Sequence, residues 1–165
     1  MAMVKANGIE IAYHERGRGD PLILIMGLGA DSSLWEDHVQ AYERHFRCIL
    51  IDNRGAGGSS KPEGPYTTKM MAADTAGLMD ALGIERACVA GISMGGAIAQ
   101  CLALDYPDKV RSQVLVSTWP KCNTYAAVVF EHLKSMRALA SPSDFTRLLQ
   151  LWIYAAPYFE ENLEE

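Results

Sequence analysis

Short apolar runs alternate with helical patterns along much of this 165-residue chain. The apolar runs cover residues 21–26, 47–51, 87–90 and 114–116. They lack polar alternation, which is typical of strands that are covered on both faces. The helical patterns between them cover residues 33–45, 68–82 and 94–105. This alternation predicts an α/β fold with a mostly parallel sheet.

The two ends of the chain differ from this central pattern. Asn7-Gly8 lies between two extended segments near the N-terminus and predicts an antiparallel hairpin at the start of the sheet. After residue 116 the strand patterns end, and residues 125–139 and 143–154 have helical patterns. We therefore expect a core of residues 1–120 and a helical segment of residues 121–165. The helix of residues 33–45 is expected to begin with a capping box of Ser33 and Glu36.

Composition narrows the class of protein. The chain has 20 acidic and 15 basic side chains and a net charge of -5, which argues against a nucleic-acid partner. No segment resembles a signal peptide or a membrane span, so we expect a cytoplasmic protein without a membrane partner. The four cysteines lack the spacing of a metal site or redox motif, so reduced thiols are expected. We expect no metal and no cofactor.

The segment Gly91-Ile92-Ser93-Met94-Gly95 fits the pattern G-x-S-x-G. An apolar strand precedes it and a helix of small residues follows it, which is the context that a nucleophile elbow requires. Glycines at 91 and 95 would remove side chains that collide with the backbone at so sharp a turn. The sequence therefore predicts that Ser93 is a catalytic nucleophile, and the alternative is a Gly-Ser turn that opens an ordinary helix.

An oxyanion hole needs two backbone donors near such a serine. The Met94 N–H, at the start of the helix, is the first candidate. The second is the Leu28 N–H, because Gly27 and Gly29 would let the loop after the first parallel strand approach the site. Alternatively, these glycines only make a tight turn.

At this point the chain resembles the N-terminal part of an α/β-hydrolase-fold protein, from the branch of esterases, enol-lactonases and cofactor-free haloperoxidase-like enzymes. Four blocks carry the resemblance, at residues 24–31, 52–59, 91–96 and 106–116. It implies a truncated hydrolase core followed by part of a helical cap. The chain departs from the family at Met26, where a histidine often precedes the glycine of the oxyanion loop. In the block at 52–59, we expect Asp52 and Arg54 to tie the loop to its neighbours rather than to catalyse.

The resemblance also implies a catalytic acid and a histidine on loops after later strands. Neither loop is expected within this chain, and residues 117–121 hold no carboxylate that could substitute. His14, His38 and His45 precede Ser93 and are assigned to the surface or to packing. His132 is the one histidine after Ser93, so it is the candidate base to test, with an ordinary surface histidine as the alternative.

Two functional hypotheses remain. The first is a carboxylic-ester hydrolase that acts on a small-molecule ester through Ser93, with activity that is weak or depends on a non-standard or partner-supplied base. The second is a catalytically silent scaffold that binds a partner or an acyl ligand. A faint dinucleotide-binding pattern from Gly27 to Ser32 lacks its third glycine, which argues against nucleotide binding. An uncovered strand ending at Val116 predicts a homodimer, formed through that edge or through the helices of residues 122–165.

Overall fold

A computed structural model describes residues 1–162 of the chain. Its strands are β1 (Ala2–Ala6), β2 (Ile9–Arg16), β3 (Asp20–Ile25), β4 (Phe46–Ile51), β5 (Ala87–Ile92) and β6 (Val110–Val116). Its α-helices are α1 (Glu36–Tyr42), α2 (Thr68–Ala81), α3 (Met94–Asp105), α4 (Thr124–Leu139), α5 (Pro142–Ile153) and α6 (Ala156–Asn162). Contacts divide the chain into two compact units, Met1–Pro120 and a second that begins at Lys121.

The six strands form one mixed sheet in the order β1-β2-β4-β3-β5-β6. The β1–β2 and β2–β4 pairs are antiparallel, whereas β3 pairs with β4 and β5, and β5 with β6, in parallel. The predicted α/β fold with a mostly parallel sheet and an N-terminal antiparallel hairpin is therefore confirmed. At the hairpin, Asn7 and Gly8 have φ values of 47° and 76°. Positive φ at both positions is what the favoured two-residue hairpin turn requires.

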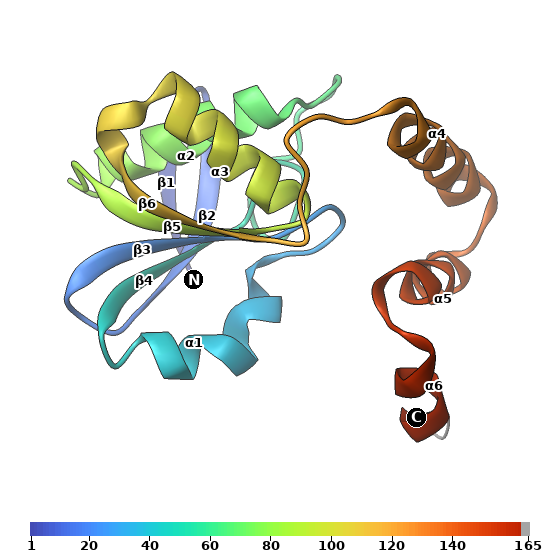
Figure 1. The fold of residues 1–165 in the computed structure, drawn as a ribbon. Coiled ribbons are helices and arrows are strands. Elements are labelled where there is room, and N and C mark those ends of the chain that lie inside the picture. The colour runs from blue at the N-terminus through green and yellow to red at the C-terminus, as the bar shows by residue number, and fades with distance from the viewer. Residues whose placement is uncertain (163–165) are drawn as a thin grey trace. The chain divides into compact units, whose positions relative to one another are not determined.

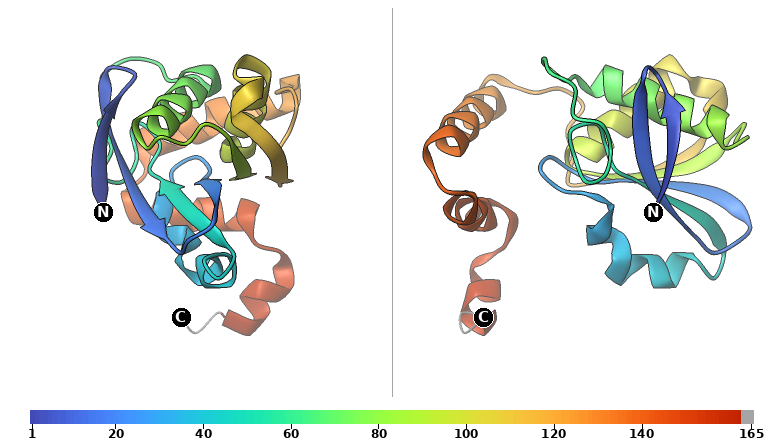
Figure 2. Two further views of the ribbon diagram at one scale, coloured as in Figure 1. Left: turned by 90° about the vertical axis from the view of Figure 1, so that its left-hand side faces the viewer. Right: turned by 180° about the vertical axis from the view of Figure 1, so that it is seen from behind.

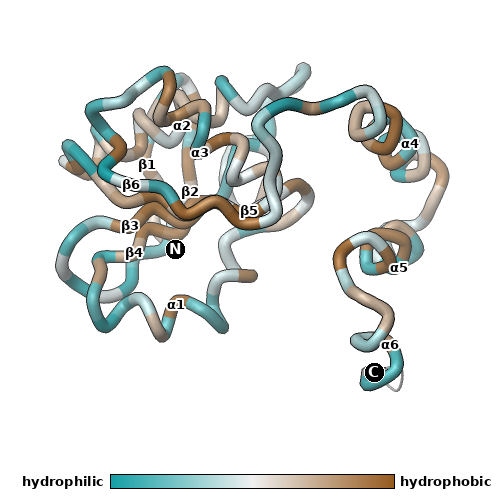
Figure 3. The backbone as a smooth tube through the Cα atoms, in the orientation of Figure 1, coloured by the Kyte–Doolittle hydropathy of each residue, from teal (hydrophilic) through white to brown (hydrophobic). Residues whose placement is uncertain are grey.

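Helices cover both faces of the sheet in the first unit (Figures 1 and 2). The side of α2 and α3 holds the larger core, which includes Ile23, Ile49 and Leu102. The side of α1 holds a smaller core around Trp35 and Leu50. Figure 3 shows the central strands as the most hydrophobic part of this unit. Burial on both faces explains why these strands are apolar without alternation.

Three elements differ from the sequence-based expectation. The helix expected at residues 33–45 is a 3₁₀ turn at Ser32–Trp35 followed by α1. The predicted capping box at Ser33 is wrong, because the Asp31 carboxylate accepts the Ser33 N–H at 2.9 Å. Strand β6 begins earlier than the apolar run at residues 114–116 predicted. Its first half is largely polar, so the apolar pattern did not reveal it, and polar residues suit an edge strand with an exposed face. The short helix α6 was not predicted.

The second unit contains α4, α5 and α6. Asn123 caps α4 by accepting the Ala126 N–H, and Ser141 caps α5 by accepting the Asp144 N–H. Neither α4 nor α5 has a fully buried residue. No described helix is long and apolar enough to cross a membrane.

Candidate active site

Ser93 lies at the turn between β5 and α3. Its φ and ψ angles are 55° and -120°, a conformation that non-glycine residues rarely adopt. Such strain costs about 1–3 kcal/mol and persists only where surrounding structure enforces it. Here the Ser93 N–H donates to the Val116 carbonyl at 2.9 Å, and the Ser93 carbonyl accepts the Gly96 N–H at 3.0 Å. The turn is therefore held from both sides.

The glycines around Ser93 let three backbone segments meet. A Cβ atom at Gly91 would lie within 3.0 Å of the backbone of Gly95 and Gly96. A Cβ atom at Gly95 would lie equally close to the carbonyl of Ile25, at the end of β3. Real Cβ atoms do not approach backbone so closely, so both positions require glycine. The first turn of α3 consequently packs directly against the end of β3.

The loop after β3, residues 26–32, is named the oxyanion loop for the predicted role of its Leu28 N–H. Its Gly27 lies against the serine, since a Cβ atom there would be 3.1 Å from the Ser93 Cβ and 3.6 Å from the Ser93 Oγ. Leu28 is 62% exposed, so burial of its side chain does not hold the loop in place. In the described part of the chain, neither the Leu28 N–H nor the Met94 N–H has a protein acceptor. The structure thus brings a serine hydroxyl and a loop with a free N–H donor together.

A pocket of about 410 Å³ lies beside this turn, a size that suits a small organic molecule. Two segments, residues 27–31 and 53–57, line it together with three single residues, Tyr66, Met71 and Met94. Among residues 1–162, no three histidine, cysteine or acidic side chains come together where they could hold a metal ion. Met94, which directly follows Ser93, is the residue of the serine turn that lines the pocket.

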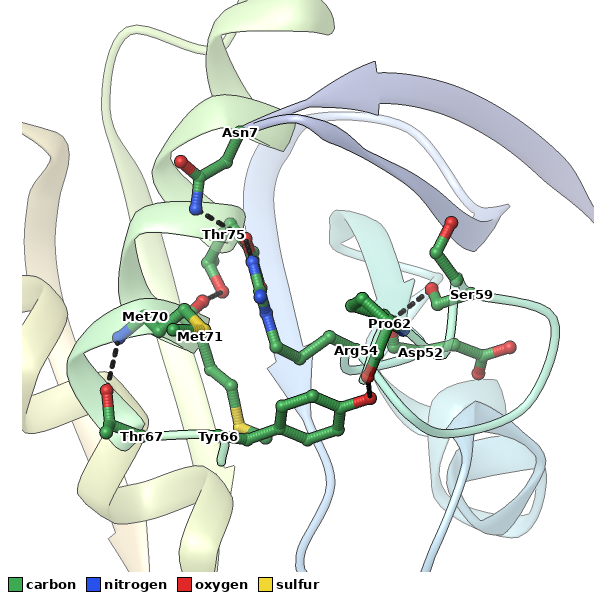
Figure 4. Close-up of polar contacts among 12 residues, drawn as sticks. Asn7, Asp52, Arg54, Ser59, Pro62, Tyr66, Thr67, Met70, Met71 and Thr75 are labelled. Carbon is green, nitrogen blue, oxygen red and sulfur yellow. Dashed lines mark hydrogen bonds and ion pairs between the residues drawn. The ribbon is translucent and has the colours of Figure 1, made fainter. Parts of the chain in front are cut away.

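The loop after β4, residues 52–60, forms one wall of the pocket. Arg54 makes a bidentate ion pair with Asp74 of α2, with both N–O distances at 2.5 Å. Asn7 of the β1–β2 turn donates to the same carboxylate at 2.7 Å, and Figure 4 shows its side chain directed at α2. The bond from Asp74 raises the pKa of the Arg54 guanidinium, which keeps it charged. Figure 4 also shows Tyr66 beneath Arg54, with its hydroxyl donating to the Pro62 carbonyl at 2.5 Å.

The family model of the α/β hydrolase fold matches residues 20–163. The chain belongs to the α/β-hydrolase fold family. The resemblance expected from the sequence is therefore confirmed. The protein BpoC of Mycobacterium tuberculosis is 45% identical over 112 residues, which are 67% of this chain and 42% of BpoC.

Two solved structures extend the comparison. An enol-lactonase from Burkholderia xenovorans LB400 is 33% identical with a TM-score of 0.80, over 97% of this chain and 62% of the lactonase. A thermophilic esterase from Thermogutta terrifontis is 30% identical with a TM-score of 0.76, over 83% of this chain and 54% of the esterase. This hydrolase-family chain thus spans between 42% and 62% of the length of these relatives.

The sequence-predicted site residues of this family member fall into two groups. The first unit brings together Gly91, Ser93, Met94, Gly95 and the oxyanion loop. His132 lies on α4 of the second unit, where its Nδ1 is 2.8 Å from the Val128 carbonyl oxygen and its side chain is exposed. Its role as a base stays a prediction.

Sequence reasoning missed two residues of this site. Asp74 is buried on the apolar face of α2, and a carboxylate there needs a cationic partner. That requirement is a sequence signal that could have linked Asp74 to Arg54. Asn53, which contacts the oxyanion loop, gives no comparable signal because an asparagine after a strand is common in loops.

Proposed function

We propose that this chain carries the nucleophile and oxyanion hole of a carboxylic-ester hydrolase, with a small-molecule ester as substrate. The observation that supports this most strongly is the strained Ser93 turn, held against a loop with a free N–H donor. Relatives named as an esterase and an enol-lactonase fit the same reaction class, because both act on a carbonyl carbon bonded to oxygen.

In this mechanism the Ser93 Oγ attacks the ester carbonyl carbon and its proton passes to a base. The carbonyl oxygen becomes an oxyanion, which accepts hydrogen bonds from the N–H groups of Met94 and Leu28. Collapse of the tetrahedral intermediate expels the alcohol, and water then releases the acyl group from Ser93. The pocket of about 410 Å³ beside Met94 would hold part of the substrate.

The mechanism needs a base that accepts the Ser93 proton. His132 of this chain or a group from another chain is proposed to take the Ser93 proton. An oxyanion hole and a pocket without a working triad still give roughly 10³- to 10⁴-fold acceleration over water in well-studied serine hydrolases. The proposal therefore allows a weak esterase activity for this chain alone.

The test is the hydrolysis of p-nitrophenyl acetate by the purified chain. Replacement of Ser93 by Ala should remove the catalysed rate. Ser117 is the matched control, because it is the other serine with a positive φ, of 47°. The Ser117→Ala variant should keep the rate. Equal rates for the wild-type chain and Ser93→Ala would refute the proposal.

A further inference from the structure

We propose that Asp52 and Asn53 are positioning residues that hold the oxyanion loop so that the Leu28 N–H faces the serine. The inference rests on the proposed function, because it concerns the donor of that same oxyanion hole. The two residues are adjacent in sequence, at the end of β4. Their side chains nevertheless reach opposite ends of the oxyanion loop.

Asn53 holds the start of the loop. Its Nδ2 donates to the Met26 carbonyl at 3.0 Å, and the bond is buried. The Met26 carbonyl and the Gly27 N–H belong to one planar peptide unit, so fixing the carbonyl also fixes the orientation of Gly27. Gly27 is the residue that lies against Ser93, and the Leu28 N–H follows it directly. Asn53 therefore acts on the donor through a single intervening residue.

Asp52 holds the end of the loop. Its Oδ1 accepts the Ser32 N–H at 2.8 Å, and its Oδ2 accepts the Gly58 N–H at 2.8 Å. The carboxylate is buried, and hydrogen bonds from N–H groups to a carboxylate are stronger than those between neutral groups. Within residues 1–162, Asp52 and Asn53 are the two residues whose side chains bond to the backbone of the oxyanion loop.

The segment that carries Asp52 and Asn53 is itself bonded to β2 and α2. The Asp52 N–H donates to the Ala12 carbonyl of β2 at 3.0 Å. The Ser59 hydroxyl donates to the Asp52 carbonyl at 2.6 Å and accepts the Ala12 N–H at 2.8 Å. Arg54 adds the buried ion pair with α2. The oxyanion loop thus depends on the sheet and on α2 for its shape.

The chemistry of Asn53 supports a positioning role over simple packing. The residue is 4% exposed, and its Oδ1 is buried without a hydrogen-bond partner in the described part of the chain. An unpaired buried acceptor is unfavourable, whereas an apolar side chain of similar size would avoid the penalty. The bond from Nδ2 to Met26 is the interaction that only an amide provides here.

The experiment compares the wild-type chain with Asn53→Leu, which keeps the number and branching of the side-chain heavy atoms and removes the donor. Gln113→Leu is the matched control, because Gln113 Nε2 also donates to a backbone carbonyl, that of Ala99 in the middle of α3, at 2.6 Å. The first readout is the NMR order parameter of the Gly27 and Leu28 amides, which reports how rigidly the loop is held. We expect Asn53→Leu to lower both order parameters from the value of rigid backbone, about 0.85, toward that of flexible backbone, below about 0.6, while Gln113→Leu leaves them unchanged.

The second readout is p-nitrophenyl acetate hydrolysis. We expect Asn53→Leu to lower kcat about 10- to 100-fold with KM within about twofold, because a displaced donor weakens transition-state binding alone. If Asn53 only stabilised the fold, Asn53→Leu and Gln113→Leu would change kcat and KM to a similar extent. Unchanged order parameters at Gly27 and Leu28 in Asn53→Leu overturn the inference. If the wild-type chain shows no Ser93-dependent hydrolysis, the proposed function fails, and the order parameters alone decide the inference. Asn53→Ala replaces Asn53→Leu if the latter does not fold.

Discussion

The ion pair of Arg54 and Asp74 should be the most sensitive polar contact in the first unit. The two side chains are 7% and 3% exposed, and they form two short hydrogen bonds. Removal of one partner leaves a buried charge without compensation, which typically costs about 3–5 kcal/mol. That is a large share of the roughly 5–15 kcal/mol by which a domain is stable. We therefore expect Arg54→Met and Asp74→Leu each to lower the free energy of unfolding by about 3–5 kcal/mol.

The double variant Arg54→Met/Asp74→Leu should behave differently. Replacing a whole buried pair with apolar side chains is often neutral or stabilising, because the desolvation penalty disappears as well. Asn7 would lose its acceptor, but its side chain is exposed and can bond to water. We expect the free energy of unfolding of the double variant to lie within about 2 kcal/mol of the wild-type value. The effects of the two substitutions should therefore be strongly non-additive.

The assay is urea unfolding followed by far-UV circular dichroism, with the slope against urea checked for constancy among the four proteins. Single variants that each cost less than about 1 kcal/mol would refute the reasoning, since the pair would then not be buried in solution. A double variant that loses as much free energy of unfolding as the two single variants together would also refute the reasoning, because the two charges would then act independently.

Three further outcomes follow from the structure. Gly95→Ala should lower the free energy of unfolding by about 1–3 kcal/mol in the same urea assay, because a methyl group there meets the backbone of β3. Iodoacetamide at pH 8 should modify Cys122, which is exposed, and spare Cys48, because burial raises the pKa of the Cys48 thiol to about 11; mass spectrometry showing equal modification would contradict this. The apolar end of β6, with Leu115 42% exposed, predicts self-association with a second copy at micromolar concentration in sedimentation velocity. Leu115→Lys should abolish it and Leu104→Lys, on α3, should not; a wild-type monomer would refute it.

Sequence patterns predicted the sheet and the serine turn because both depend on local chemistry. Strands buried on both faces must be apolar, and a turn as sharp as that at Ser93 requires Gly91 and Gly95. The cap of the first helix was assigned two residues too late. Asp31 and Ser33 are both good capping residues, and sequence alone does not show which one has the extended backbone of a cap.

The supports of the oxyanion loop could not be predicted from local patterns. Asn53 and Met26 are 27 positions apart, and Arg54 and Asp74 are 20 positions apart. Each pair meets only because neighbouring strands and a crossing helix bring the two loops together. An expectation that Asp52 and Arg54 tie their loop to its surroundings fits the observed bonds, but it did not name the partners.

The most direct test of a nucleophilic Ser93 is its covalent labelling by a fluorophosphonate, located by peptide mass spectrometry. The reagent reacts with an activated hydroxyl, so labelling is compared between the native chain and the chain unfolded in urea. We predict an adduct on Ser93 that forms faster in the native chain and none on Ser117. An adduct that is absent, or that forms equally fast in unfolded protein, would contradict the assignment of Ser93 as a nucleophile.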